Sequence, residues 1–330
     1  MNFKEFIGID VSKSHIDVFI RFNGLHAKFE NSQTGFKKMI DCIQTHVEYS
    51  LAEVLFAFEH TGIYSLHLSL FLDKAQYNFT VIPGLELKRS LGITRGKSDK
   101  SDARSIAQYA YEKKEKLKLH QMPSQTLLKL KRLASYRERL VKERAAFKSR
   151  LGEYETFLDQ QENCVLFESH HKMMACLDQQ IEKVENELYR LIKQDQELTR
   201  QFNLINSIKC VGCQTALMMI ILTNGFTLFE KWRQFASYAG TAPFPNQSGT
   251  FKGKTRTSHL ANKRIKALLS CCATSAIQYS PEMKIYYQTR VEQGKNQMST
   301  INIIRNKLLA RIFAVVQRDT PYVDTYRYVG

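Results

Sequence analysis

Residues 126–200 contain no proline and only one glycine, Gly152. Proline and glycine are the residues that most disfavour helices, so this composition favours long helices. Apolar residues in it recur at steps of four and three, the spacing of a heptad seam. The later stripe is Leu177, Ile181, Val184, Leu188 and Leu191, and the earlier one begins with Leu127, Leu130, Leu133 and Leu140. Two long helices with a loop near residues 159–169 therefore predict an antiparallel coiled coil over residues 123–200. We interpret its leucines as core or oligomer contacts rather than as a site.

The residues before this segment alternate short apolar runs with helical patterns. The stretch FIGIDVSKSHIDVFI predicts two strands, residues 6–11 and 15–20, because apolar and β-branched residues alternate on either side of a tight turn. The elements expected next are a strand at 25–30, a helix at 33–45, a strand at 55–58, a helix at 66–75, a strand at 78–82 and a helix from about residue 98. This order predicts an α/β domain with a mixed sheet over residues 1–122.

The residues after the coiled coil, 201–330, predict a third and mainly helical domain. Residues 208–212, followed by an apolar helix, have the outline of a helix-hairpin-helix turn, in which backbone N–H groups at a helix start can hold a phosphate. Further helices are expected at 232–239, 263–279 and 302–316. Between the first two lies the segment TAPFPNQSGTFKGKTRTS, which is rich in Pro, Gly, Ser and Thr and predicts an irregular loop.

The chain is strongly basic, with 48 Lys and Arg against 32 Asp and Glu and a formal net charge of +16. Residues 113–150 contain thirteen Lys and Arg against three Glu, a basic face that is either solvated or placed along a nucleic-acid backbone. Because no amphipathic membrane anchor accompanies this charge, nucleic acid is a better expectation than lipid. The longest apolar run, residues 216–222, is far shorter than the roughly 18–20 residues of a membrane helix. With no signal-peptide pattern, we expect a cytoplasmic protein without membrane contact.

The cysteines bear on the same expectation. There are seven, an odd number, and Cys210 and Cys213 form the only C-x-x-C. No second pair and no histidine pair at zinc-finger spacing accompanies them. This pattern favours the reduced thiols of a cytosolic protein over a structural zinc site.

Four acids stand at positions that suit metal-ion chemistry. Asp10 is near the end of the first expected strand and Glu59 ends a later one, while Asp99 and Asp102 are three residues apart on one helix face. Carboxylates from two strand ends and a helix can form a cage for hard divalent cations. Alone, Asp10 is as readily an acid that caps a hairpin, and D-x-x-D at a helix start is more often a capping pattern. The basic residues around the pair favour phosphodiester chemistry instead: Lys88, Arg89, Arg95, Lys97 and Arg104.

Ser248 is the other candidate. It precedes Gly249 in a loop that also contains Lys252, Lys254 and Arg256, and a glycine there leaves room for a phosphate to approach. Most Ser-Gly pairs are simple turns. The sequence has no Gly-x-Ser-x-Gly elbow, which excludes an esterase of that type.

These segments together resemble a known family. GIDVSK, FEHTGIY and KSDKSDARSIA look like the DEDD motifs of the insertion-sequence one-ten family of transposases, a family that is related to the pilin-gene invertases. The segments IKCVGCQTA, FASYAGTAPFPNQSGT and HLANKRIKALL are similar to the motifs of its C-terminal half. The resemblance covers nearly the whole chain in the family's order.

The resemblance implies a prokaryotic, nucleoid-associated DNA recombinase. Residues 1–122 would be a RuvC-like, ribonuclease H-like domain in which Asp10, Glu59, Asp99 and Asp102 hold Mg²⁺ or Mn²⁺. Residues 201–330 would supply Ser248, which attacks the scissile phosphate and forms a covalent phosphoserine intermediate. Donor and target DNA are the implied substrates. Homodimers or homotetramers with composite sites, and guidance by a bridge RNA, are also implied.

The chain departs from the family's pattern at several positions outside the catalytic ones. Lys209-Cys210-Val211-Gly212 stands where Pro-Gly-x-Gly is usual, and Gly240-Thr241-Ala242-Pro243 replaces Gly-Leu-x-Pro. The last motif has Ala261-Asn262 for Gly-Asn, and Lys266 for arginine. The residues we expect to contact nucleic acid are Lys88, Arg89, Arg95, Lys97, Arg104, Lys252, Lys254, Arg256, Lys263 and Arg264.

Three other readings compete with the recombinase. A RuvC-like, structure-specific endonuclease would use water in place of Ser248. An actin-like kinase shares a strand-turn-strand with an acid, but its Asp-x-Gly spacing is absent here and no second Gly-rich phosphate loop occurs. A non-catalytic nucleic-acid binder would use only the positive charge, and Asp10→Asn would then leave its activity intact.

Overall fold

A computed structural model describes residues 3–90 and 98–324. The chain divides into two compact units, residues 1–122 and residues 123–330. The second unit holds both the long helices and the C-terminal helices, so a separate domain boundary near residue 200 stays a prediction.

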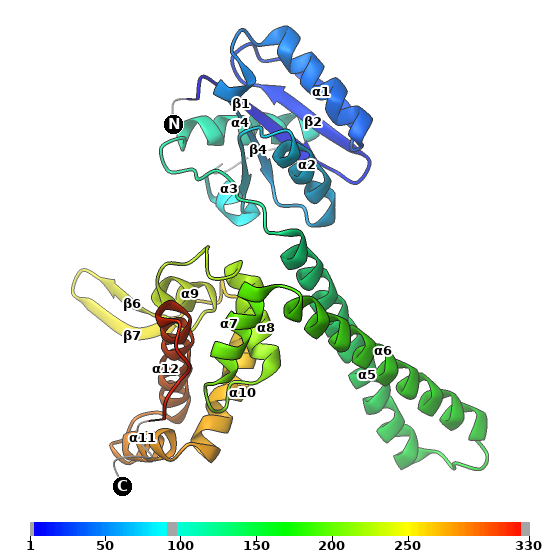
Figure 1. Cartoon of the computed structure of the whole chain (residues 1–330), viewed down its shortest axis with the longest axis vertical. Helices are drawn as coiled ribbons and strands as arrows, with labels where there is room; N and C mark the ends of the chain where they lie inside the picture. Colours follow the sequence, from blue (N-terminus) through cyan, green and yellow to red (C-terminus); the bar gives the residue numbers. More distant parts are fainter. Residues whose placement is uncertain (1–2, 91–97, 325–330) are drawn as a thin grey trace. The chain divides into compact units, whose positions relative to one another are not determined.

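The first unit is built on a five-stranded mixed sheet in the order β3-β2-β1-β4-β5 (Figure 1). The central strand β1 pairs antiparallel with β2 and parallel with β4, which in turn pairs parallel with β5. The strands are β1 (Glu5–Val11), β2 (His15–Ile20), β3 (His26–Glu30), β4 (Val54–Glu59) and β5 (Phe79–Ile82). The predicted mixed sheet is confirmed, with strand bounds within about two residues of the expectation.

Helices cover both faces of this sheet. Alternate residues of β1, such as Ile7 and Ile9, pack with α1 (Gln33–His46) and α2 (Ile63–Lys74). The opposite face of β1 begins with Phe6, which packs with residues of α3 and α4. These two helices are α3 (Gly84–Ser90) and α4 (Asp99–Glu112), and a 3₁₀ turn, Leu51–Glu53, precedes β4. Helix α3 was not predicted; of its residues only Lys88 and Arg89 were considered, as basic side chains.

Gly8 allows α4 to lie directly on β1. A Cβ atom at this position would overlap the carbonyl oxygen of Ala103 and the amide nitrogen of Ala107. Both neighbours are backbone atoms of a packed helix, so relief requires the whole helix to move.

Gly8→Ala is therefore expected to destabilise the chain by about 1–3 kcal/mol, the usual effect of overpacking a core. Gly152→Ala is the matched control, because no atom of the described residues lies within 4 Å of a Cβ at that helical position. It should stabilise by up to about 1 kcal/mol through helix propensity. Denaturant unfolding followed by circular dichroism measures both changes, and equal stability of Gly8→Ala and the wild type would contradict the packing argument.

Glu5, the first residue of β1, is a buried acid with 2% of its surface exposed. Its Oε1 accepts hydrogen bonds from the backbone N–H groups of Phe6 (2.7 Å) and Phe22 (3.3 Å). Burial raises the pKa of this carboxyl above its ordinary value, because the charged form loses hydration.

Glu5→Gln keeps the accepting oxygen and removes the charge, so its effect on stability should depend on pH. A pKa that is higher in the folded state means that ionisation above about pH 4.3, the unfolded value, opposes folding. The melting temperature of Glu5→Gln relative to the wild type should therefore rise as the pH increases from about 4 to about 7. Thermal unfolding at several pH values measures it, and a constant difference would show that Glu5 titrates normally.

The second unit begins with two long helices, α5 (Gln125–Phe157) and α6 (Cys164–Lys193), which run side by side (Figure 1). Arg137 Nε lies 2.6 Å from Glu185 Oε1, and Arg144 forms an ion pair with Asp178. Because later residues of α5 meet earlier residues of α6, the helices are antiparallel, as predicted. The loop is shorter than expected, because α6 already begins at Cys164. Coiled-coil packing in the strict sense stays a prediction.

The remaining helices of this unit share one hydrophobic core with α5 and α6. They are α7 (Gln196–Asn206), α8 (Cys213–Thr223), α9 (Trp232–Tyr238), α10 (Lys263–Tyr279), α11 (Pro281–Glu292) and α12 (Gln297–Arg318). Helix α11 was not predicted, and α12 begins earlier and ends later than expected. The structure of the described residues contains no helix that is long and apolar enough to span a membrane.

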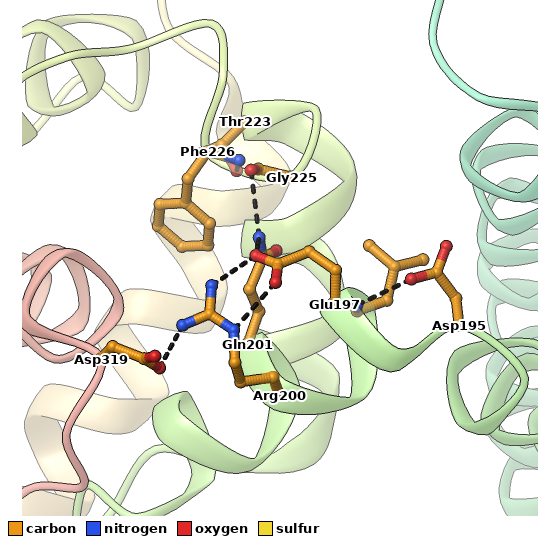
Figure 2. Close-up of polar contacts among 9 residues, drawn as sticks. Asp195, Glu197, Arg200, Gln201, Thr223, Gly225, Phe226 and Asp319 are labelled. Carbon is orange, nitrogen blue, oxygen red and sulfur yellow. Dashed lines mark hydrogen bonds and ion pairs between the residues drawn. The ribbon is translucent and has the colours of Figure 1, made fainter.

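Polar contacts from α7 tie it to two neighbouring segments (Figure 2). Arg200 pairs with Glu197 on its own helix and with Asp319 at the end of α12. Gln201 Nε2 donates to Glu197 Oε1 (2.7 Å) and to the carbonyl of Gly225 after α8 (3.2 Å). The hydrogen bonds from Arg200 and Gln201 lower the pKa of Glu197. The cluster thus links α7, the α8–α9 connection and the α12 terminus.

The segment 241–258 differs from its prediction as an irregular loop. It forms an antiparallel hairpin of β6 (Pro243–Ser248) and β7 (Phe251–Thr257). All side chains of β6 are exposed, so no buried, alternating apolar face marked it as a strand. The register shifts between Phe244 and Asn246, which leaves Pro245 at an irregularity where its missing N–H costs no ladder hydrogen bond.

Candidate active site

Asp10 and Glu59 lie at one end of the sheet on neighbouring parallel strands. Ile9 pairs with Phe58, so the next residue of each strand, Asp10 and Glu59, follows in the same register. Alternation along the strands places both acids on the face that packs against α3 and α4. Each is half-buried. The structure thus brings these two predicted residues to the same rim.

The carboxylate of Glu59 lies against the start of α3. A Cβ atom on Gly84, the first residue of that helix, would overlap Oε1 of Glu59. Only glycine leaves this space to the acid, so Gly84 helps to determine where the carboxylate sits.

Asp99 and Asp102 occupy the first turn of α4. Ser98 caps this helix by accepting a hydrogen bond from the N–H of Ser101, and the predicted start of the helix near residue 98 is confirmed. Asp102 is half-buried and Asp99 is exposed.

The direction of α4 relative to β1 relates these acids to Asp10. The ring of Phe6 contacts that of Tyr111 near the end of α4 (centroids 5.5 Å apart), whereas Gly8 faces Ala103 and Ala107. The helix therefore runs backwards along β1. Asp10, two residues further on the same face, lies toward the first turn of α4.

These acids lie at the same end of one sheet face, but their side chains are not close enough together to form a metal site. Within residues 3–90 and 98–324, no three His, Cys, Asp or Glu side chains lie close enough together to hold a metal ion. Their donor chemistry nevertheless fits Mg²⁺ or Mn²⁺, which prefer carboxylate oxygens. Metal binding by the four acids remains a prediction.

Sequence analysis missed Asp17, a further acid beside Asp10. Asp17 pairs with Asp10 across β1 and β2, so the two side chains share a face of the sheet. Asp17 is 5% exposed, and its two oxygens contact His26 Nε2 (2.9 Å) and Lys28 Nζ (3.6 Å) from β3. A lone acid in the apolar run HIDVFI was the available signal, because a buried carboxylate requires cationic partners.

The predicted basic residues of this unit are placed in part. Lys88 and Arg89 lie in the last turn of α3 and Arg104 lies on α4, all three exposed and without an ion pair in the described part of the chain. Arg95 and Lys97 lie outside the described residues.

Ser248 lies at the tip of the β6–β7 hairpin. It is exposed and pairs with Phe251 across a two-residue turn, Gly249-Thr250. Gly249 has φ 56°, the conformation that the first central residue of a type II′ hairpin turn requires. On β7 the side chains of Lys254 and Arg256 are exposed, and the backbone of Lys252 pairs opposite Gln247. The predicted serine thus stands on a projecting basic hairpin.

Lys263 and Arg264, at the start of α10, have different surroundings. Lys263 is exposed. Arg264 Nη1 lies 3.0 Å from Glu138 Oε2, and its Nη2 donates to the carbonyl of Ala134 (2.8 Å). Burial lowers the pKa of this guanidinium. Because Arg264 joins α10 to α5 inside the fold, we omit it from the proposed nucleic-acid interface.

Two further features of the second unit bear on ligand binding. A shallow pocket of about 510 Å³ lies at the base of the hairpin, lined by Ser237, Phe244, Arg256, Thr257, Ser258 and Leu260. In the predicted helix-hairpin-helix turn between α7 and α8, Cys210 has φ 70°, a conformation that favours glycine. Cys210 thus adopts a backbone conformation that a glycine would adopt more easily, and phosphate binding at this turn stays a prediction.

Two family models match the chain. The DEDD transposase model of IS110, described as "Transposase", matches residues 7–160, which include all four acids. The model described as "Transposase IS116/IS110/IS902 family" matches residues 202–288, which include Ser248. The chain belongs to the IS110 family of transposases. This confirms the family that the motifs resembled, the insertion-sequence one-ten family.

Relatives of the chain agree with this assignment. It is 27% identical over 332 residues to the "Pilin gene-inverting protein" of Moraxella bovis, covering 97% of this chain and 98% of that one. The same figures hold for the "Pilin gene-inverting protein" of Moraxella lacunata. An "Insertion element IS110 uncharacterized 43.6 kDa protein" of Streptomyces coelicolor is 25% identical over 118 residues, 36% of this chain and 29% of that protein. As a member of a transposase family, the chain is a DNA-cleaving recombinase.

Proposed function

We propose that this IS110-family transposase exchanges DNA strands through a covalent bond between Ser248 and a DNA phosphate. The observation that supports it best is the position of Ser248, exposed at the tip of a basic hairpin next to a glycine turn. Its Oγ attacks the phosphorus, a P–O bond to deoxyribose breaks, and the deoxyribose hydroxyl leaves with a proton. The phosphoserine ester conserves the energy of the broken bond. A hydroxyl from the other DNA can then attack it and release Ser248.

The metal ion belongs to the first unit in this proposal. Asp10, Glu59, Asp99 and Asp102 would hold Mg²⁺ or Mn²⁺, and the bound ion would supply positive charge to the phosphate and to the leaving oxygen. Two observations support this assignment. Asp10 and Glu59 follow paired residues of the neighbouring strands β1 and β4, and the first turn of α4 lies toward Asp10. The exposed side chains of Lys88, Arg89 and Arg104 would bind the DNA backbone nearby.

The same proposal extends to partners. The acids and Ser248 lie in different units, so a homodimer or homotetramer could combine acids of one subunit with the serine of another. A bridge RNA would supply target choice, and the net charge of +16 suits two nucleic-acid partners. Exposed Lys254, Arg256 and Lys263, with Lys252 of β7, would contact the DNA that Ser248 attacks. We place this activity in the prokaryotic cytoplasm, at the nucleoid.

The test of this proposal is isolation of a covalent protein–DNA adduct. A DNA substrate with a nick near the cleavage position traps the intermediate, because the short strand diffuses away before religation. Mass spectrometry of the adduct should locate the DNA on Ser248.

A RuvC-like endonuclease that uses water is the second candidate. The observation that favours it is that every predicted metal ligand lies in residues 1–122, a compact unit without the serine. It predicts cleavage with free DNA ends and no adduct.

A further inference from the structure

A polar cluster lies where the β6–β7 hairpin leaves the helical core. Thr241, two residues before β6, is fully buried. Its carbonyl accepts hydrogen bonds from Asn302 Nδ2 (2.9 Å) and Asn306 Nδ2 (3.0 Å) on α12, and its hydroxyl donates to Asn306 Oδ1 (3.0 Å). These neutral groups fulfil each other's hydrogen-bonding needs, so hydrogen bonds hold the base of the hairpin against one face of α12.

Arg305 belongs to the same helix face but is not satisfied in the same way. It follows Asn302 by three residues, is 8% exposed, and its Nη1 donates to Asn302 Oδ1 at 3.4 Å, a long hydrogen bond. Its Nε is enclosed and has no acceptor among residues 3–90 and 98–324. No acid within the described residues forms an ion pair with it. Burial alone lowers its pKa, without a contribution from any neighbouring charge.

Arg311, on the same helix, is an arginine whose charge is paired with a carboxylate. Its Nη2 lies 2.7 Å from both carboxylate oxygens of Glu282 on α11. In the part of the chain that the structure describes, the guanidinium of Arg305 has no such partner, although an arginine cannot lose its proton to escape the cost of burial. A buried, permanently charged group without an anion is costly, so an anion that contacted Arg305 would stabilise the folded chain.

We propose that Arg305 is the centre of a binding site for an oxyanion of the phosphate class at the base of the hairpin. A phosphate matches the planar fork of a guanidinium, which can donate from two nitrogens at once. Two of its nitrogens, Nε and Nη2, make no hydrogen bond within the described residues and are therefore the donors that we assign to the oxyanion. Asn302 and Asn306, which hold Thr241, would connect an occupied site to the position of the hairpin.

The proposal does not depend on the chemistry assigned to Ser248. The oxyanion is either a backbone phosphate of a bound nucleic acid or free phosphate, and both use the same donors. The first would place a DNA or RNA strand along α12, and the second would make phosphate a structural ligand of the free protein.

The first experiment measures how inorganic phosphate changes the melting temperature, at an ionic strength held constant with KCl. Wild type should show a saturable rise with phosphate. Arg305→Met should lose this rise, and without phosphate it should melt at or above the wild-type temperature, since an unpaired buried charge has been removed. The control Arg311→Met breaks the Glu282 pair; it should melt lower and keep the phosphate response.

Two outcomes would overturn the proposal: an Arg305→Met protein that keeps the full phosphate response, or a wild type that has none. If Arg305→Met does not fold, Arg305→Lys serves instead, because it keeps the charge and loses the fork. Its phosphate midpoint should shift upward about tenfold, the loss expected for one strong hydrogen bond to an anion. An unchanged midpoint in Arg305→Lys would also contradict the site.

The second experiment separates the two phosphate sources. Binding of a duplex oligonucleotide is measured against salt for wild type and Arg305→Met. If Arg305 holds a backbone phosphate, the slope of log K against log salt should fall by about one unit. An unchanged slope, together with a lost phosphate response, assigns the site to free phosphate. Ser248→Ala should retain the phosphate response in full, so failure of the covalent mechanism leaves this result unaffected.

Discussion

Ser248→Ala is expected to abolish strand exchange, with a loss of at least about a thousandfold, and to form no covalent DNA adduct. Removing an attacking oxygen removes the first bond-forming step, and losses of that size or more are usual for a nucleophile. The protein should still fold, because Ser248 is exposed at a hairpin tip and makes no side-chain hydrogen bond in the described residues. Recombination between two plasmid sites measures activity, and denaturing gel electrophoresis detects the adduct.

Thr250→Ala is the matched control for this prediction. Thr250 is the second residue of the same two-residue turn, is exposed, and offers a hydroxyl two positions from Ser248. Its removal should leave strand exchange within about threefold of wild type, since it lies away from the reacting bond. DNA cleavage that persisted at the wild-type rate in Ser248→Ala would identify water as the nucleophile and favour the endonuclease.

The first unit could be predicted well because its strands are short runs of apolar and β-branched residues between turns. Nearly every residue of β1 and β2 is buried, so the sequence of each strand is marked by its apolar composition. Asp10 and Glu59 were found for the same reason, since strand ends follow from strand bounds. Asp17 was missed because its importance depends on which residue of β1 lies opposite and on the side chains of His26 and Lys28 supplied by β3.

The hairpin β6–β7 shows why exposed strands escape prediction. Its residues contain Pro, Gly, Ser and Thr, which are typical of turns, and no burial pattern contradicts that composition. What makes it a hairpin is backbone pairing around Gly249 and the fastening of Thr241 to α12. Such contacts join residues about sixty positions apart and leave no local signal.

The arginines show the same limit for the candidate site. Arg256 and Arg264 look alike in the sequence, as parts of one basic region. The structure leaves Arg256 exposed beside a pocket and encloses Arg264 against Glu138. Arg305 was not considered at all, because its lack of an anion is visible only once the helices around it are packed. Charge can be counted from a sequence, whereas its compensation depends on tertiary neighbours.

Asp10→Asn is expected to lose strand exchange by at least about a thousandfold and to lose the stabilisation that divalent ions give the wild type. The amide keeps the size of the side chain but is a poor ligand for Mg²⁺, which prefers charged oxygens. Melting temperatures in EDTA and at increasing Mn²⁺ or Mg²⁺ measure metal binding separately from catalysis. Removing metal from the wild type should stop strand exchange, and restoring it should recover the activity.

Asp17→Asn separates this effect from damage to the sheet. It changes the acid directly opposite Asp10, and it leaves His26 and Lys28 without their carboxylate. This variant should therefore melt below wild type but still gain stability from metal, because the carboxylate of Asp17 already contacts His26 and Lys28. Asp10→Asn should show the reverse pattern, with folding intact and the metal response gone. If Asp10→Asn kept the metal response and Asp17→Asn lost it, the metal ligand would be Asp17 on β2 and not Asp10 on β1.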